Sequence, residues 1–451
     1  MTTADKHYNK MTTAPLTRLI VSLGLPTTFS MLITNIYNMA DTYFVGTVGK
    51  SAQAATGILF ALQAVIQAIA FMLGQGSGTM VSKFLADNDK TNANKYVSSA
   101  FFGGIAVGTV FMALGLSFLT PLLNFLGSTA TILPYARQYG ACVLIGCPVV
   151  MGSFVLNNNL RYEGKALYAM FGLVSGGIIN ILGDYLLVMV FKLGVLGAGI
   201  ATLVSQIISF TLLVIFYKKQ AQSKLLLSAV DKNVSTYLTI SKIGFPAFIR
   251  QGLSSFSHGL LNNLTRPFGD AAIAAMSIAN RFSAFVMCVG LGIGQGYQPV
   301  ASFNWQTKNY DRVKRGLLVT MGIGLCLISA ISLPSVIFAD KIALLFQKNT
   351  DVLKIAVPAL RYACIGTMFL TLSVPINMLY QSTRRPVMSS ILSLMRSGVM
   401  FIPTLIITTN LFGLWGIILS QPIADALTGI VSIPFILHFL LKEKSTHKNC
   451  E

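Results

Sequence analysis

Acidic residues are scarce in this chain, and three of them stand where an acid is unfavourable. Of 14 Asp and Glu residues, eleven lie in polar segments or near the ends of apolar ones, while Asp41, Asp184 and Asp425 lie inside apolar segments. A carboxylate at the centre of a bilayer costs about 2.5 to 3.5 kcal/mol on insertion scales. Each of the three therefore needs a partner or a function. For Asp41 and Asp184, the alternative to a functional site is a structural polar contact between helices.

The neighbours of Asp184 favour a site for a small cation. Asn180 precedes it by four residues and shares its helix face, so an amide oxygen and a carboxylate point in the same direction. Ala198 and Thr202 have the same spacing in the next apolar segment, where a backbone carbonyl and a hydroxyl could complete an oxygen shell. Hard cations prefer oxygen ligands. The pattern predicts a site for a monovalent cation.

Asp425 is interpreted differently, because the preceding apolar segment carries Arg396. A single buried charge is costly, so the two residues are predicted to form an ion pair between helices, with a transport role as the alternative. Arg250 and Arg361 either extend to the membrane surface or face a cleft, and the sequence leaves that choice open.

Four residues are candidates for binding a substrate: Tyr37, Tyr139, Asn157 and Asn180. Tyr37 lies four residues before Asp41 on the same helix face. Tyr139 and Asn157 stand near the two ends of the fourth apolar segment. Together the four side chains could line a cavity that mixes aromatic and amide groups; simple packing is the alternative for each of them.

The elements that must position these residues are membrane helices. The chain has 451 residues, 54% hydrophobic and 10% charged, and a mean hydropathy of +0.69, which excludes a water-soluble globular fold. One helix needs about 20 apolar residues to cross the bilayer. We predict an all-α polytopic membrane protein with twelve transmembrane helices, at 17–45, 52–82, 96–120, 132–158, 166–190, 194–217, 240–265, 271–301, 315–339, 352–380, 386–409 and 413–441.

Basic residues predict the orientation of these spans. With a cytoplasmic N-terminus, the segments facing inward hold 22 Lys and Arg and those facing outward hold six, as the positive-inside rule requires. Both termini are therefore expected in the cytoplasm. Since the basic residues alternate with spans and form no patch with aromatic neighbours, topology explains the net charge of +19 better than nucleic-acid binding.

The chain contains an internal repeat. A shift of 220 residues matches Gly24 and Pro26 with Gly244 and Pro246, and the GQG motif at 74–76 with the GQG motif at 294–296. We predict an N-terminal six-helix lobe (1–217), a cytoplasmic linker (218–239) and a C-terminal six-helix lobe (240–451), which share one orientation in the membrane.

Several motifs carry a family resemblance that covers essentially the whole chain. They are GQGYQPVASFNWQTKNYDRVKR from Gly294 to Arg315, Pro26 followed by ADTYFVG at 40–46, NNNLRYEG at 157–164 and NILGDYLL at 180–187. The chain resembles the multidrug and toxic compound extrusion (MATE) family, in its bacterial MepA-like branch.

The resemblance implies twelve helices in two lobes, cation-coupled antiport and export of amphipathic organic cations. It also implies a cation site in the N-terminal lobe at the positions occupied here by Asp41, Asn180, Asp184, Ala198 and Thr202. Some relatives use acids in spans seven and eight or ten. Those spans contain no interior Asp or Glu here, and the shift of 220 places Leu261 opposite Asp41, so coupling is expected in the N-terminal lobe.

Taken together, the sequence predicts a multidrug efflux antiporter of the bacterial plasma membrane that works by alternating access. The coupling ion is Na⁺ or H⁺, the partners are drug-like small molecules and the lipid bilayer, and a monomer without a cofactor is expected. A flippase for lipids or lipid-linked oligosaccharides is the alternative function. An enzyme is not expected, because no phosphate-binding loop, HExxH or GxSxG motif occurs.

Overall fold

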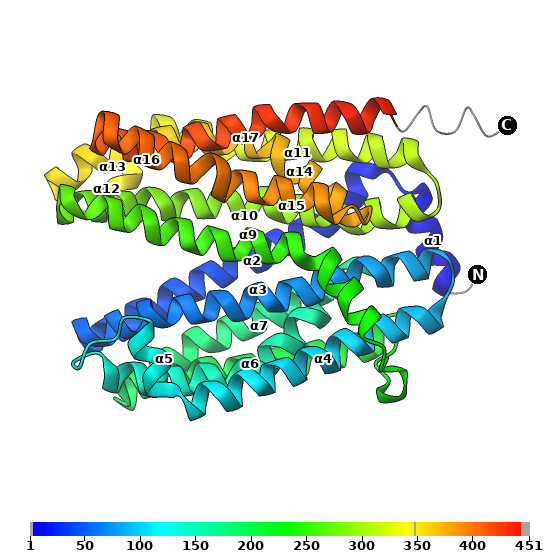
Figure 1. Ribbon diagram of the computed structural model, residues 1–451, viewed down its shortest axis with the longest axis horizontal. Helices are drawn as coiled ribbons and strands as arrows, with labels where there is room; N and C mark the ends of the chain where they lie inside the picture. The colour runs from blue at the N-terminus through cyan, green and yellow to red at the C-terminus, as the bar shows by residue number, and fades with distance from the viewer. Residues whose placement is uncertain (1–2, 347–348, 443–451) are drawn as a thin grey trace. The chain divides into compact units, whose positions relative to one another are not determined.

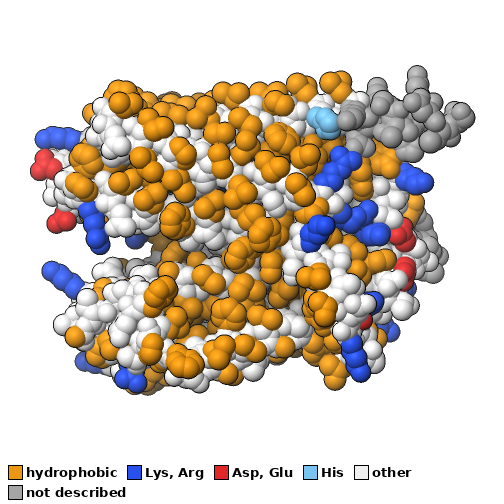
Figure 2. Space-filling view, viewed as in Figure 1, with side chains coloured by type: hydrophobic (Ala, Val, Ile, Leu, Met, Phe, Trp, Pro, Cys, Tyr) orange, Lys and Arg blue, Asp and Glu red, His pale blue; other side chains and the backbone are white. Residues whose placement is uncertain are grey.

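The protein is built from helices, as the sequence predicts. The computed structural model describes residues 3–346 and 349–442, and no strand occurs within these ranges. In hydrocarbon a helix satisfies its backbone N–H and C=O groups within one segment, so long apolar segments adopt this structure. Figure 2 shows hydrophobic side chains along the helices and Lys and Arg side chains toward their ends.

The helices follow one another in the order α1 (Thr3–Thr13), α2 (Leu16–Val48), α3 (Lys50–Ala86), α4 (Lys90–Ser117), α5 (Leu119–Phe125), α6 (Leu133–Tyr162), α7 (Ala166–Asp184) and α8 (Gly194–Gln220). Then come α9 (Val234–Thr265), α10 (Asp270–Gln306), α11 (Tyr310–Ile337), α12 (Ala339–Phe346), α13 (Thr350–Met368), α14 (Leu370–Ser382), α15 (Pro386–Leu394), α16 (Phe401–Phe412) and α17 (Leu414–Lys442). Two π-helical segments, η1 (Tyr185–Val190) and η4 (Met395–Met400), continue α7 and α15, and the short 3₁₀ helices are η2 (Leu227–Ala229) and η3 (Arg266–Phe268).

The twelve predicted spans coincide with these helices. Ten helices of the described chain are long and apolar enough to cross a membrane, and the pair α13 and α14, bent by 44°, adds an eleventh span. Helix α9 takes the remaining place; its 32 residues are long enough to cross, but it is not one of the ten helices that are apolar enough. The sequence reasoning missed α5 and α12, which occupy corresponding places in the two halves of the repeat.

Two compact units make up the chain, and their limits differ from the halves of the sequence. Unit 1 takes residues 3–7 together with Phe29–Gln251, and unit 2 takes Tyr8–Thr28 together with the described residues after Gln251 (Figure 1). The beginning of α2 thus belongs with the C-terminal helices. The beginning of α9 belongs with the N-terminal helices.

Glycines of the repeated motifs explain why the beginnings of α2 and α9 pack with the helices of the other half. In unit 1, a Cβ atom added to Gly76 of α3 would meet the backbone carbonyl of Ile240 in α9, and one added to Gly244 would meet the carbonyl of Met72. In unit 2, a Cβ atom on Gly296 of α10 would meet the backbone of Gly24 in α2. The motifs that reveal the repeat are therefore the positions where two helix backbones approach too closely for any side chain.

The predicted linker is fastened to unit 1. Glu163, just after α6, accepts hydrogen bonds from the backbone N–H of Gln222 (2.5 Å) and the hydroxyl of Tyr217 (3.2 Å). Burial raises the pKa of Glu163 above its usual value, although these hydrogen bonds oppose the shift. Farther along, Lys95 of α4 forms an ion pair of 2.6 Å with Asp231.

The glycine contacts can be tested with one pair of substitutions in α3. We expect Gly76→Ala to lower the free energy of unfolding by about 1 to 3 kcal/mol, because the new methyl group overlaps the Ile240 carbonyl. Gly57→Ala is the matched control, since nothing lies within 4 Å of its added Cβ atom. Melting temperatures of the purified variants in detergent measure the difference. Equal melting temperatures would contradict the close approach.

Candidate functional site

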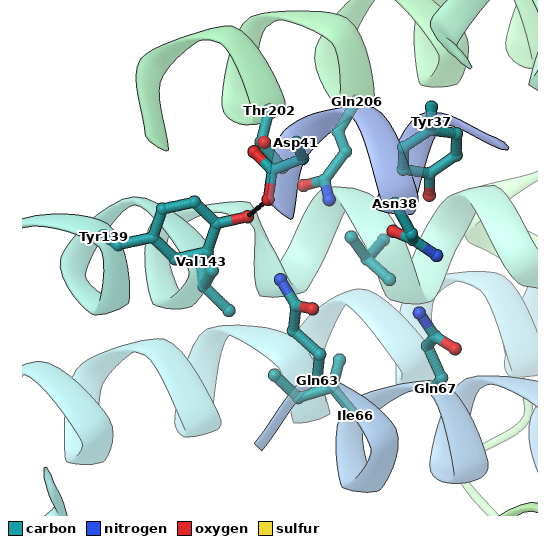
Figure 3. Close-up of a pocket in the computed structure, with 11 residues that line it drawn as sticks. Tyr37, Asn38, Asp41, Gln63, Ile66, Gln67, Tyr139, Val143, Thr202 and Gln206 are labelled. Carbon is teal, nitrogen blue, oxygen red and sulfur yellow. Dashed lines mark hydrogen bonds between the residues drawn. The ribbon is translucent and has the colours of Figure 1, made fainter. Parts of the chain in front are cut away.

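Asp41 and Tyr139 form the centre of a polar site in unit 1. Asp41 lies in α2 and Tyr139 in α6, and both side chains are buried. The Tyr139 hydroxyl donates a hydrogen bond of 2.8 Å to Oδ2 of Asp41 (Figure 3). The other carboxylate oxygen, Oδ1, is buried and has no hydrogen-bond partner among the described residues. A half-satisfied carboxylate of this kind is unusual in a folded protein and indicates a functional role.

A cavity opens beside this pair. It has an empty volume of about 470 Å³, including the part open to solvent, which lies in the size range of small-molecule sites. Its wall contains the acid, two tyrosines, four amides, one hydroxyl and three aliphatic residues: Asp41, Tyr37, Tyr139, Asn38, Gln63, Gln67, Gln206, Thr202, Ile66, Val143 and Val150. Figure 3 shows the amides arranged around the same space as the carboxylate.

Sequence reasoning missed the amide side chains of this cavity. A signal for them exists, because Gln63 and Gln67 are four residues apart in an apolar segment and therefore share one face of α3. Amides offer both donors and acceptors. They add hydrogen-bonding groups to a wall that is otherwise aromatic, aliphatic and acidic.

Asn180, Asp184 and Thr202 come together next to the cavity. The Asn180 side chain donates to the Thr202 hydroxyl over 3.2 Å. Asn180 Oδ1 and both carboxylate oxygens of Asp184 are buried without a hydrogen-bond partner in the part of the chain that is described. The arrangement gathers carboxylate, amide and hydroxyl oxygens, which are the ligands that hard cations prefer.

Local backbone structure positions these groups. The α-helix α7 ends at Asp184, and the π-helical η1 begins at the next residue. Such π-helical turns widen a helix locally and are frequent at functional sites. Ala198 is fully buried in the hydrophobic cluster that also contains Tyr139, at the beginning of α8. Of the residues predicted to hold a cation, Asp41 and Thr202 thus share the cavity wall, and the side chain of Asn180 is hydrogen-bonded to Thr202.

The four predicted substrate residues differ in their relation to the cavity: Asn180 is not part of its wall but is hydrogen-bonded to Thr202, which is. Tyr37 and Tyr139 line the cavity. Asn157 is not part of its wall: its amide donates to the Ala169 carbonyl over 3.0 Å and joins α6 to α7. The repeat contains the same bond, since Asn377 donates to the Ser389 carbonyl over 2.8 Å, 220 residues later. A contact present in both halves indicates a structural role for Asn157.

Asp425 and Arg396 form the predicted ion pair in unit 2. Arg396 Nε donates to Asp425 Oδ1 over 3.1 Å, and Gln421 donates to the same oxygen over 3.0 Å. Arg396 lies in η4, a second π-helical segment. The pair joins this segment to α17 and gives the acid a cation and an amide as partners.

The two arginines that the sequence left open have different surroundings. Arg361 of α13 forms an exposed ion pair of 3.3 Å with Asp340 of α12. Arg250 of α9 donates to Gln75 of α3 over a long 3.4 Å within unit 1. Arg361 is thus engaged by an acid of the neighbouring helix α12.

Comparisons with known proteins identify relatives over nearly the whole chain. The MatE family model matches residues 26–186 and 246–407. The chain is 27% identical over 444 residues to the multidrug export protein MepA of Staphylococcus aureus (strain MRSA252), covering 96% of each protein. Its fold is similar to a crystal structure of MATE in complex with MaL6, with a TM-score of 0.92 and 22% identity over 98% of this chain and 99% of that chain. An outward-facing multidrug resistance MATE family transporter of the MOP superfamily has a TM-score of 0.91 and 22% identity over 99% of both chains.

The two Arg–Asp pairs of unit 2 provide a matched test of burial. Arg396→Met leaves Asp425 buried beside Gln421 alone, and we expect a loss of about 3 to 5 kcal/mol in the free energy of unfolding. Arg361→Met should cost at most about 1 kcal/mol, because the side chains of its pair are 44% and 65% exposed, against 16% and 2% for the buried pair. Denaturation of both purified variants measures the two losses. Similar losses would show that burial does not set the strength of these pairs.

Proposed function

The chain belongs to the MatE family of membrane transporters, and from this premise we propose that it exports amphipathic organic cations in exchange for a monovalent cation, Na⁺ or H⁺. One observation carries the proposal: the Asp41 carboxylate stands in the wall of the unit 1 cavity with only one of its oxygens hydrogen-bonded. The relative MepA is named a multidrug export protein, which agrees with a cavity of this size and composition.

The coupling cation in this proposal binds between α2, α7 and α8. Asp41 and Asp184 provide negative charge, Asn180 and Thr202 provide neutral oxygens, and the Ala198 carbonyl completes the set. Two nearby carboxylates in a medium of low dielectric repel each other, so a bound cation or proton removes a large electrostatic cost. Asn180 Oδ1 and both carboxylate oxygens of Asp184 are buried without a hydrogen-bond partner among the described residues, which supports a cation site at this place.

The substrate in this proposal occupies the cavity next to the cation site. Tyr37 and Tyr139 offer aromatic faces to a flat organic cation. The glutamines of α3 and α8 offer hydrogen bonds, and Asp41 offers the counter-charge. Substrate and coupling ion both depend on Asp41, so the negative charge that holds one is unavailable to the other. This exclusion is what an exchanger requires.

Helix α2 is the element through which the ion acts in this proposal. Pro26 lies inside the helix, ten residues after its beginning, and therefore is not a residue that starts it. A proline inside a helix removes one backbone hydrogen bond and permits a kink. Cation capture by Asp41, on the same helix, then favours one curvature of α2 over another and releases the substrate.

The flippase alternative has less support. It depends on arginines that line a cleft, namely Arg250 and Arg361. Arg361 is engaged by Asp340, Arg250 donates to Gln75, and neither arginine is part of the cavity wall. We therefore propose export rather than lipid flipping. The exporter in this proposal is a monomer without a cofactor, and it lies in the bacterial plasma membrane with both termini in the cytoplasm. A small-molecule substrate and the coupling ion are its partners.

Substitution of the two acids tests the coupling site. We expect Asp41→Asn and Asp184→Asn each to abolish drug efflux while the protein stays at normal abundance in the membrane, because each removes a charge from the cation site. Asp340→Asn is the control, since this acid is exposed and lies in α12 of unit 2. Efflux of a fluorescent cationic dye from reconstituted vesicles measures activity, first under a sodium gradient alone and then under a proton gradient alone. Full efflux by Asp41→Asn would refute the assignment, and efflux under neither gradient would refute ion coupling.

Competition between ligands tests the shared use of Asp41. Binding of a fluorescent organic cation to the purified protein should weaken as Na⁺ rises or as pH falls, because either ligand neutralises the carboxylate that attracts the drug. Gln67→Leu is expected to weaken drug binding and to leave the ion effect in place, since Gln67 lines the cavity but supplies no charge. Drug affinity that is indifferent to both Na⁺ and pH would contradict a shared site.

A further inference from the structure

Two turns at one end of unit 2 form a single basic surface. One turn joins α10 to α11, and the other joins α14 to α15. They touch, because Arg384 donates to the Gln306 side chain over 2.7 Å and the Arg385 guanidinium lies 5.1 Å from the centre of the Trp305 ring. We call this surface the basic face; its cations are Lys308, Arg312, Lys314, Arg315, Arg384 and Arg385.

The charge of this surface exceeds that of its counterpart in the repeat. Segments 303–315 and 381–386 hold six basic residues and one acid. The corresponding segments of unit 1, 83–95 and 161–166, hold five basic residues and three acids. Asp and Glu contribute little to membrane topology. The positive-inside rule therefore accounts for the cations of both surfaces but not for the scarcity of acids on the basic face.

Backbone strain marks the same two turns. Lys308 and Arg384 adopt left-handed conformations, with φ of 59° and 61°. At the matching positions of unit 1 stand Asn88 (φ 58°) and Gly164 (φ 73°), the residue types that tolerate this conformation best. Unit 2 thus has a long cation at both places where the turn favours Asn or Gly. Strain that a fold retains in this way points to a function for the side chain.

The cations of the basic face divide into two kinds. Arg312 donates to the backbone carbonyls of Met11 and Ala14, and Lys314 donates to that of Leu440 over 2.8 Å, so these two fix the ends of neighbouring segments. Lys308 and Arg315 are exposed. The contact with the Trp305 ring fixes the position of the Arg385 guanidinium in the turn that touches theirs.

Apolar helix surfaces begin directly beside these charges. Helix α15 starts after Arg385, and its residues Val387 and Met388 are 63% and 40% exposed. Helix α11 continues from Arg315 to Leu318, which is 51% exposed. Both helices belong to membrane spans. The basic face therefore stands where the polar and hydrocarbon layers of a bilayer meet.

We propose that the basic face is a binding site for an anionic phospholipid, which holds the lipid phosphate with Lys308, Arg315 and Arg385 while the acyl chains lie on α15 and α11. Arginine and lysine bind phosphate oxygens strongly, and a phospholipid is the phosphate compound that also supplies hydrocarbon at this depth. A zwitterionic lipid fits less well, because its own cation is repelled. The site concerns unit 2 alone and does not depend on the direction or coupling of transport.

Lipid competition tests the proposal on the full-length protein. The protein is placed in bilayers with equal amounts of phosphatidylglycerol and phosphatidylcholine, extracted in neutral detergent, and analysed by native mass spectrometry for the lipid that it retains. We expect preferential retention of phosphatidylglycerol. Lys308→Gln with Arg315→Gln should lower that preference roughly five-fold for each cation removed. Lys90→Gln with Lys165→Gln is the matched control in unit 1, and it should leave the preference unchanged.

A second variant separates lipid binding from folding. Lys308→Asn places in unit 2 the residue that unit 1 has at Asn88, so it should melt at the same or a higher temperature while its preference for phosphatidylglycerol falls. The proposal is overturned if the wild type retains both lipids equally, if the Lys308 variants keep the full preference, or if the unit 1 control loses as much preference as they do. The last result would mean that the overall positive charge of the protein, and not the basic face, causes the preference for phosphatidylglycerol.

Discussion

Hydrocarbon gives a buried charge no hydrogen-bond partner, and this constraint governs the arrangement of both units. The three membrane acids meet it in different ways. Asp425 has a cation and an amide on one oxygen. Asp41 has a single tyrosine hydroxyl, and Asp184 has no described hydrogen-bond donor. Unsatisfied carboxylates are costly in such surroundings, so unit 1 contains the centre that gains most from a mobile cation, while unit 2 contains one that its own residues already neutralise.

The spans and the Asp425–Arg396 pair could be predicted because they depend on local composition. An apolar segment of sufficient length becomes a membrane helix in any fold, and a buried acid needs a nearby cation. The limits of the two units could not be predicted in this way. They depend on which helix backbone packs on Gly76 and Gly296, a contact between segments far apart in the chain. The hydrogen bond of Asn157 could not be predicted for the same kind of reason, since its partner, the Ala169 carbonyl, belongs to another helix.

The repeat separates what the fold requires from what a function requires. Asn157 and Asn377 make the same bond between helices in both units, so this contact belongs to the scaffold. Asp41 has no acidic counterpart, because Leu261 occupies the matching position and is buried in a hydrophobic cluster. Where the two units carry different residues at matching positions, the shared fold does not require one particular residue type. The acid at position 41 is therefore not a demand of the shared scaffold.

The same comparison limits how the proposed cation site could influence unit 2. Helices α2 and α9 each belong partly to one unit and partly to the other. Of the two, only α2 carries a membrane acid, at Asp41, and its first part packs through Gly24 on the backbone of α10. A change in the charge of Asp41 alters the free-energy cost of burying the part of α2 that belongs to unit 1. The part that belongs to unit 2 is fixed by the close backbone contact of Gly24 with α10. If α2 bends in response, the bend must therefore lie between Gly24 and Asp41. Pro26 lies in this stretch and lacks one backbone hydrogen bond, so the helix bends most easily there.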